Sequence, residues 1–305
     1  MSAPNIVKAA GGDWFHEIWQ GAAGGMFRVN KLLYADNSEH QNILVFENDV
    51  FGRMLAIDNV VQVAEADEFI YHEMITHVGA LAHGGVKRVL IVGGGDGGAI
   101  RELFRHKTIE AVTLVEIDKA VIDLCAQWMP MVADGAFDDP RLNLVIGDGA
   151  KFVTETDERF DMIIVDSTDP VGPGAVLFTE EFYRGCHRAL APGGILVTQS
   201  GLPFVQAKEF TGAFGALSEI FAYATGFQIV VPSFWGGPMI LGFATDDAAL
   251  VAPPVHALAA RKAAVDLTCK YYTPGHHRSA FQLPSYVSEM LPHAEKLLAE
   301  GLIEA

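Results

Sequence analysis

The first sixty or so residues alternate between short apolar runs and polar turn residues. Apolar or partly alternating runs lie at 26–29, 43–46, 53–57 and 60–63. Asparagine and aspartate at 47–49 and 58–59 suit the turns between them, because these residues tolerate a left-handed backbone. The pattern predicts small strands joined by hairpins. Residues 69–81 then show helical spacing, and we expect this helix to lead into a second domain.

From Lys87 onward, near-continuous apolar strands alternate with helical segments. The strands predicted in this part lie at 89–92, 112–117, 142–146, 162–165, 195–198, 227–231 and 239–244. Such strands indicate a parallel sheet covered by helices on both faces. The proline- and glycine-rich link before the last strand suggests an antiparallel hairpin. We therefore predict an α/β, methyltransferase-like Rossmann domain over 78–305, preceded by a small β domain over 1–77.

Composition narrows the function classes. The chain has 305 residues, half of them apolar, and a net charge of −17, with no basic cluster suited to nucleic acid. Cys125, Cys186 and Cys269 are too few and too widely spaced for a disulfide framework or a zinc site. With no leader-like or membrane-spanning pattern, we expect a cytoplasmic protein without a membrane or nucleic-acid partner.

An aspartate stands inside the glycine-rich turn that follows the first strand of the sheet. Gly93, Gly95 and Gly98 would allow a ligand to approach the backbone closely, at a helix N-terminus that suits an anion. Asp96 opposes an anion and attracts an ammonium group. The pocket is therefore expected to hold a nucleoside with a cationic tail.

The following strand ends carry further carboxylates. Glu116 suits a ribose, because a carboxylate accepts hydrogen bonds from both vicinal hydroxyls, and Asp148 suits the exocyclic amine of adenine. Asp166 and Asp169 follow the fourth strand. An alkylamine, with a pKa near 10.4, must lose a proton before it attacks carbon, which costs roughly 4 to 5 kcal/mol at neutral pH. A carboxylate at this place can accept that proton.

The chain resembles spermidine synthase, a polyamine aminopropyltransferase, along most of its length. The resemblance rests on residues 14–17, 40–41, 61–62, 67–73, 93–102, 115–118, 148–149, 166–173 and 270–272. It implies transfer of an aminopropyl group from decarboxylated S-adenosylmethionine, a co-substrate, to putrescine or a related diamine. The product nucleoside is 5′-methylthioadenosine, and the resemblance implies neither a metal nor a cofactor.

The resemblance also assigns roles to individual residues. Asp166 would be the general base. The donor and its nucleoside would contact Gln41, Gly93, Gly95, Asp96, Glu116, Asp148, Gly149 and Pro173. The amine would lie among Trp14, Gln62, Tyr71, His72, Asp96, Asp166, Ser167, Thr168, Asp169, Gln199 and Phe234. Taken from the residues alone, Tyr71 and His72 are also compatible with core packing, Trp14 with sealing of the N-terminal strands, and Gln41 with a solvated loop.

Two positions depart from the family pattern. Phe234 stands where a tyrosine is usual, and Asn42 where an aspartate is common. The more apolar channel that results favours a longer diamine, such as cadaverine. The family also implies a homodimer or homotetramer joined through the N-terminal strands, while residues 171–177 are a candidate lid.

Three other functions share part of this pattern. A methyltransferase using intact S-adenosylmethionine shares the adenosine contacts, but Asp96 and the Asp166/Asp169 pair argue against it. A nicotinamide oxidoreductase fits the glycines and leaves the acidic segment unexplained. A non-catalytic nucleoside or polyamine sensor would be expected to lack Asp166.

Overall fold

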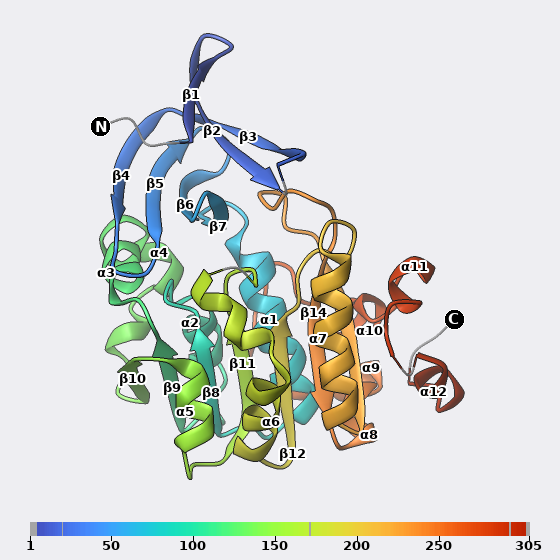
Figure 1. Ribbon diagram of the computed structural model, residues 1–305. Coiled ribbons are helices and arrows are strands. Elements are labelled where there is room, and N and C mark those ends of the chain that lie inside the picture. Colours follow the sequence, from blue (N-terminus) through green and yellow to red (C-terminus); the bar gives the residue numbers. More distant parts are fainter. Residues whose placement is uncertain (1–4, 20, 171, 293, 303–305) are drawn as a thin grey trace.

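The computed structural model describes residues 5–19, 21–170, 172–292 and 294–302. The N-terminal part forms two antiparallel sheets (Figure 1). One contains β1 (Ile6–Ala9), β2 (Gly12–Trp19) and β3 (Ala23–Val29); the other contains β4 (Lys31–Asn37), β5 (Asn42–Asn48), β6 (Gly52–Ile57) and β7 (Val60–Ala64). The predicted strands are confirmed, with the run at 26–29 ending the longer β3. Asp58 and Asn59 adopt positive φ between β6 and β7, as expected of a turn.

Seven strands form the sheet of the α/β part, in the order β10-β9-β8-β11-β12-β14-β13. Their bounds are β8 (Arg88–Gly93), β9 (Ala111–Glu116), β10 (Leu142–Ile146), β11 (Phe160–Asp166), β12 (Leu190–Gln199), β13 (Tyr223–Ile229) and β14 (Met239–Thr245). Neighbours from β10 to β12 are parallel, and β14 is antiparallel to both β12 and β13. The predicted parallel sheet with a final hairpin is confirmed. The strand order reverses between β8 and β11, where ligands bind in open α/β sheets.

Helices cover both faces of this sheet. The helices are α1 (Glu68–His83), α2 (Gly98–Phe104), α3 (Lys119–Trp128), α4 (Pro130–Ala133), α5 (Gly149–Glu155), α6 (Glu180–Ala189), α7 (Ala207–Ile220), α8 (Ala248–Val251), α9 (Val255–Ala264), α10 (Pro274–Ala280), α11 (Ser285–Ser288) and α12 (Ala294–Ala299), with 3₁₀ turns at Ala136–Asp138 and Gly172–Phe178. One core joins α1, α2 and α8 to α10 with the sheet, and a second joins α5, α6 and α7 with its other face. No helix in the described ranges is long and apolar enough to cross a membrane.

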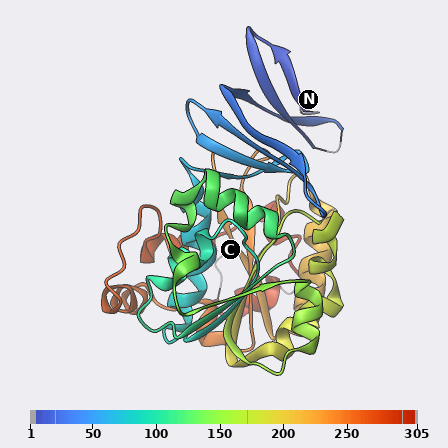
Figure 2. The same cartoon turned by 90° about the vertical axis from the view of Figure 1, so that its left-hand side faces the viewer.

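Helix α3 joins the two parts of the molecule. Val121, Leu124 and Cys125 on α3 pack with Ile43 and Leu55 of the four-stranded sheet in one apolar cluster. The N-terminal sheets therefore stand over one end of the α/β part, as the second view shows (Figure 2). This packing fixes the N-terminal strands opposite the strand ends that carry the predicted site.

Helix α1 is buried almost throughout and carries polar side chains into the interior. The Glu73 carboxylate accepts hydrogen bonds from the backbone N–H groups of residues 270, 271 and 272. His77 lies between His106, with ring nitrogens 3.0 Å apart, and Glu102. Burial lowers the pKa of His77 and lowers that of His106 to about 3. These contacts tie the C-terminal segment and α2 to α1.

We expect the buried histidines to make the protein sensitive to acid. Unfolded His106 takes up a proton near pH 6.5, whereas the folded ring does so only near pH 3. The unfolded state therefore binds more protons between these values, and stability falls as the pH falls through this window. The free energy of unfolding of His106→Gln should therefore fall less on acidification than that of the wild type. The two slopes should differ by at most about 1.4 kcal/mol per pH unit.

Urea denaturation of wild type and His106→Gln at pH 7, 6 and 5 measures this difference. His256→Gln, at an exposed position of α9, is the control and should follow the wild type. If the free energies of unfolding of wild type and His106→Gln fell in parallel with pH, His106 would not be a source of the acid sensitivity.

Candidate active site

A cavity of about 330 Å³ lies between the N-terminal strands and the carboxyl ends of the parallel strands. Strands β2, β6 and β7 contribute Glu17, Leu55 and Gln62 to its wall. The sheet contributes the residues that follow β8, β9, β10, β11 and β12. The cavity thus coincides with the point where the strand order reverses. Most of the predicted site residues lie on its wall: Gln41, Gln62, Tyr71, Gly93, Gly95, Asp96, Glu116, Asp148, Gly149, Asp166, Ser167, Thr168, Asp169, Gln199 and Phe234.

The glycine turn brings the backbone close to its neighbours. Gly93 has φ +84°, and a Cβ there would lie 2.1 Å from the carbonyl oxygen of Asp166. A Cβ on Gly95 would lie 2.9 Å from Oε2 of Glu116. Glycine is therefore required at the first position and keeps space beside the Glu116 carboxylate at the second.

The Glu116 carboxylate is buried, and the backbone N–H groups of Asp118 and Gly95 compensate for this only in part. Its Oε1 accepts a hydrogen bond from the backbone N–H of Asp118, 2.8 Å away. Burial is the main reason that its pKa rises to about 7, and the carboxylates of Asp118 and Asp166 add to the rise. Donors from a ligand, such as a pair of hydroxyl groups, would restore the hydrogen bonds that burial removes.

Two more predicted residues lie near Glu116. Asp148 is the N-cap of α5, and its Oδ1 accepts from the backbone N–H groups of Ala150 and Lys151. Gln41, in the turn before β5, donates from Nε2 to Oδ2 of Asp118 over 3.1 Å. Gln41 therefore connects the N-terminal sheet to the end of β9 at the cavity.

Asp166, at the end of β11, has one carboxylate oxygen occupied and one without a partner. The Tyr71 hydroxyl donates to Oδ1 over 2.7 Å. Oδ2 is buried and has no hydrogen-bond partner. Burial and the carboxylate of Asp96 raise the pKa of Asp166 to about 6, although His72 and Tyr71 act in the opposite direction. The Asp166 carboxylate is therefore mostly ionised at neutral pH and takes up a proton as the pH falls through about 6.

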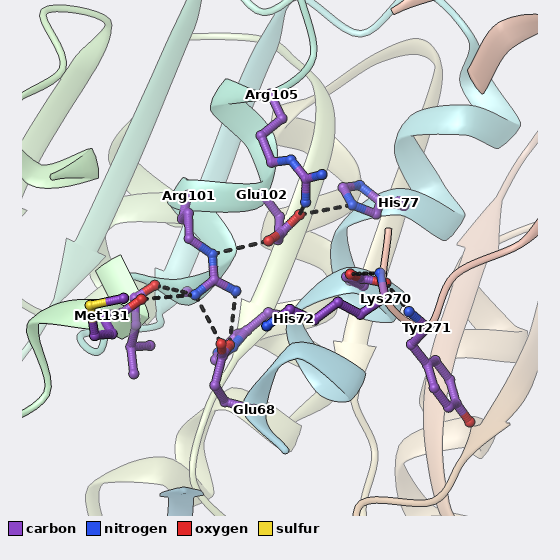
Figure 3. A network of polar contacts seen from close by, with 12 residues as sticks. Glu68, His72, His77, Arg101, Glu102, Arg105, Met131, Lys270 and Tyr271 are labelled. Atoms are coloured by element: carbon purple, nitrogen blue, oxygen red, sulfur yellow. Dashed lines mark hydrogen bonds and ion pairs between the residues drawn. The ribbon is translucent and has the colours of Figure 1, made fainter. Parts of the chain in front are cut away.

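Asp96 lies at the cavity wall with His72 behind it. Its Oδ1 accepts from the backbone N–H of Gly98 over 2.7 Å and lies 3.3 Å from Nε2 of His72. The other ring nitrogen, Nδ1, lies 2.6 Å from Oε2 of Glu68, which in turn contacts Arg101. Figure 3 shows Arg101 and His72 converging on Glu68.

His72, Asp96 and Asp166 offer ligand atoms that lie within 4.8 Å of one another. Both ring nitrogens of His72 already face carboxylates, so the ring donates at both and has no lone pair for a metal ion. This group is therefore better suited to binding an organic cation than a metal.

Asp169 is held by two glutamines. Its Oδ1 accepts from Nε2 of Gln206 over 2.8 Å and from Nε2 of Gln199 over 3.4 Å. Oε1 of Gln199 and Oγ of Ser167 are buried without partners. Burial raises the pKa of Asp169 despite both amide donors. Oε1 of Gln199 and Oγ of Ser167 can therefore each accept a hydrogen bond from a ligand that donates.

The far end of the cavity is aromatic. Phe234 and Trp235 lie on its wall with Tyr71, and the rings of Tyr71 and Phe234 are 6.2 Å apart. Asp67 fixes the loop that carries them, because its carboxylate accepts from the backbone N–H and the hydroxyl of Ser233.

Glu17 and Trp19 of β2 also line this end, and the sequence analysis missed both. Glu17 is 2% exposed and accepts from the backbone N–H of Val61 and from Nε1 of Trp19. Burial raises its pKa. The available signal was the period of two along β2, which puts Glu17 on the same face as the buried Phe15.

The structure places two predicted residues away from the cavity wall. Trp14 lies on β2 in the alternation opposite to Glu17 and Trp19, which face the cavity. His72 is 1% exposed and contacts the site through Asp96. The side chain of Pro173 lies outside the described part of the structure.

Two family models match the chain, and curated relatives cover most of it. Residues 68–252 match the spermine/spermidine synthase domain, and residues 13–65 match the spermidine synthase tetramerisation domain. The polyamine aminopropyltransferase of Ruegeria sp. is 51% identical over 87% of this chain and 93% of its own length. That of Klebsiella pneumoniae is 47% identical over 91% of this chain and 97% of its own.

Solved structures show the same fold. A spermidine synthase in complex with the transition-state analogue AdoDATO is 35% identical, with a TM-score of 0.86 over 91% of this chain and 94% of that one. The spermidine synthase of Thermotoga maritima is 33% identical, with a TM-score of 0.83 over 91% of this chain and 93% of that one.

We expect Gly98→Ala to disturb the site by crowding. A Cβ at Gly98 would lie 2.3 Å from Cε1 and Nδ1 of His72, so the buried ring would have to move. The loss of stability should be about 1 to 3 kcal/mol by urea denaturation. Gly215→Ala on α7 is the control, because nothing lies within 4 Å of its added Cβ, and it should be neutral or stabilising. Equal effects of the two changes would contradict this reading.

Proposed function

The chain belongs to the spermidine synthase family of polyamine aminopropyltransferases, and we propose that it transfers the aminopropyl group of decarboxylated S-adenosylmethionine to a diamine. The observation that carries this proposal is the unpartnered Oδ2 of Asp166, buried beside Asp96 and next to a nucleoside-sized cavity. A buried carboxylate oxygen of this kind favours a ligand that donates a proton or carries positive charge.

The proposed donor lies with its nucleoside at the ends of β8 to β10. Glu116 binds the two ribose hydroxyls, Asp148 and Gly149 bind the adenine, and Gln41, Gly93, Gly95 and Pro173 complete this half. The ammonium of the aminopropyl tail lies at Asp96. The carboxylate of intact S-adenosylmethionine would be repelled there, which argues against the alternative of a methyltransferase.

The proposed reaction is a direct displacement. One amine of the diamine enters as an ammonium and gives a proton to Oδ2 of Asp166. The neutral nitrogen then attacks the methylene carbon bonded to the sulfonium, and the carbon–sulfur bond breaks with its electron pair going to sulfur. The products are 5′-methylthioadenosine and a lengthened polyamine that carries the positive charge. The fixed positions of the two substrates supply much of the rate.

The proposed acceptor extends from Asp166 toward the aromatic end of the cavity. Gln62, Tyr71, Ser167, Thr168, Asp169 and Gln199 surround the reacting amine, and the second ammonium reaches the buried Glu17, beside Trp19. Phe234 makes the path between them apolar. The acceptor is therefore putrescine or a longer diamine such as cadaverine.

The assembly and location are also proposals. The match of residues 13–65 to a tetramerisation domain supports a homo-oligomer, and we propose a dimer or tetramer joined through the N-terminal strands.

The free Cys125 and Cys186 are both buried, which suits a reducing compartment such as the cytoplasm. The division into residues 1–77 and 78–305 stays a prediction.

We expect Asp166→Asn to abolish turnover while leaving nucleoside binding intact. An amide cannot accept the proton, so kcat should fall by about a hundredfold to ten-thousandfold. The dissociation constant of 5′-methylthioadenosine should stay near that of the wild type. In the wild type, kcat/KM should rise with pH up to about 6, where Asp166 ionises.

Methylthioadenosine formation and calorimetric binding measure the two quantities. Asp139→Asn, which removes a carboxylate paired with Arg141 at a distant surface, is the control and should retain full activity. Loss of nucleoside affinity in parallel with kcat would remove Asp166 from the role of base.

A diamine panel tests the role of Phe234. Phe234→Tyr adds a hydroxyl to an apolar stretch, so the ratio of kcat/KM for putrescine to that for cadaverine should rise by about tenfold. Phe204→Tyr is the matched control, because this ring is 78% exposed and is not part of the cavity wall. An unchanged ratio in Phe234→Tyr would exclude this residue from acceptor selection.

A further inference from the structure

Asp96 is the last of a line of four buried or half-buried groups of alternating charge. Arg101 donates from its two terminal nitrogens to the two oxygens of Glu68, over 3.0 and 2.8 Å. Glu68 then contacts His72, and His72 contacts Asp96. Figure 3 shows the first three of these groups.

Each member of this line is fixed by the fold. Glu68 and His72 are one turn apart on α1. Arg101 on α2 also donates to the carbonyl oxygens of Met131 and Val132 at α4. Asp96 is held by the backbone N–H of Gly98 at the start of α2. Three helices therefore determine where the carboxylate of Asp96 points.

The charges around His72 favour its protonated form. Glu68 and Asp96 face its two nitrogens, Asp166 with its partner Tyr71 lies on the cavity side, and Arg101 lies beyond Glu68. Burial alone would lower the pKa of His72, but the two contacting carboxylates raise it well above its ordinary value. An imidazolium donates at both nitrogens, as this geometry requires.

We propose that Glu68 and His72 are positioning residues, anchored by Arg101, that present Asp96 to the ammonium of the aminopropyl donor. The proposal rests on the proposed function. Both contacts of Asp96 described above use Oδ1, which leaves Oδ2 for the ligand. Without the imidazolium, Asp96 keeps only the more remote charge of Arg101 against the nearby Asp166, which favours uptake of a proton by one of the two carboxylates. A protonated or reoriented Asp96 no longer selects the cationic tail.

The selectivity for the tail distinguishes this role from a purely structural one. Decarboxylated S-adenosylmethionine carries the ammonium and a sulfonium charge, whereas 5′-methylthioadenosine has the same nucleoside with a neutral sulfur and no ammonium. A positioning defect therefore weakens binding of the first and spares the second. A general loss of structure weakens both.

The experiment is calorimetric binding of both nucleosides to wild type and Glu68→Gln between pH 6.5 and 9. Glu68→Gln removes one of the two carboxylates that keep His72 protonated. We expect binding of the decarboxylated donor to weaken by about tenfold at pH 8.5, the cost of one charge-assisted hydrogen bond, and less at pH 6.5. Affinity for 5′-methylthioadenosine should not change at either pH.

Glu73→Gln is the matched control. It makes the same change at another buried carboxylate of α1, whose contacts are the backbone N–H groups of residues 270–272. We expect this variant to be less stable while its ratio of donor to methylthioadenosine affinity follows the wild type at every pH.

His72→Gln provides a second variant if Glu68→Gln does not fold. Its amide can still donate to Asp96 but carries no charge, so the loss of donor affinity should be the same across the pH range. An unchanged ratio of the two affinities in both variants would overturn the proposal. A wild type that binds both nucleosides but forms no methylthioadenosine from donor and diamine would overturn the proposed function instead.

Discussion

The burial of several carboxylates around one cavity is the constraint on which the rest of this structure depends. Asp96, Asp166, Asp169, Glu116 and Glu17 all face one cavity. The pKa is raised for four of them, chiefly by burial, and lowered only for Asp96, where His72 and the N–H of Gly98 outweigh burial. Removing such groups from water without full compensation opposes folding. The apolar cores on both faces of the sheet must offset this cost, and a cationic ligand relieves it.

Helix α1 is the element that makes the arrangement possible. Within two turns it carries Glu68 and His72, the charged pair behind Asp96. It also carries Tyr71, whose hydroxyl donates to Oδ1 of Asp166. Asp67, its N-cap, holds the loop that carries Phe234, and Glu73 holds the C-terminal segment. A helix with so many polar side chains would normally lie at the surface. Here each of these side chains has a specific partner, so their hydrogen bonds fix how four separate segments meet.

Much of this architecture could be predicted from the sequence, because strand pattern and burial agree. Near-continuous apolar strands indicated a sheet covered on both faces, and the polar residues at their ends had to gather at one edge. β1, β2 and β4 were not predicted, and for β4 the reason is that Lys31–Asn37 is largely exposed and has no apolar period. The family resemblance implied a place for Trp14 at the amine channel. In the structure, Glu17 and Trp19, on the alternate positions of β2, line the cavity wall.

Partners from distant segments were beyond the reach of sequence patterns. Gln206 orients Asp169 from the turn before α7, and Arg101 reaches Glu68 from another helix. Neither residue has a local signature, because a hydrogen bond between segments depends on how the segments pack. The same holds for His72, which reads equally well as a core histidine or as a ligand. In the structure, His72 is neither a simple core residue nor on the cavity wall: it is buried and contacts Asp96, which lines the cavity.

The local charge of the cavity, rather than the net charge of −17, governs which molecules it selects. Surface carboxylates are screened within about 10 Å at ordinary salt, whereas those in the cavity act at short range through a medium of low dielectric constant. In the proposed function, a sulfonium nucleoside with an ammonium tail and a diamine would together bring several positive charges to the same acids. Two positive substrates also repel each other, and the acids between them would offset that repulsion. The carboxylates would therefore allow both to be present at once, which is the arrangement that the proposed displacement requires.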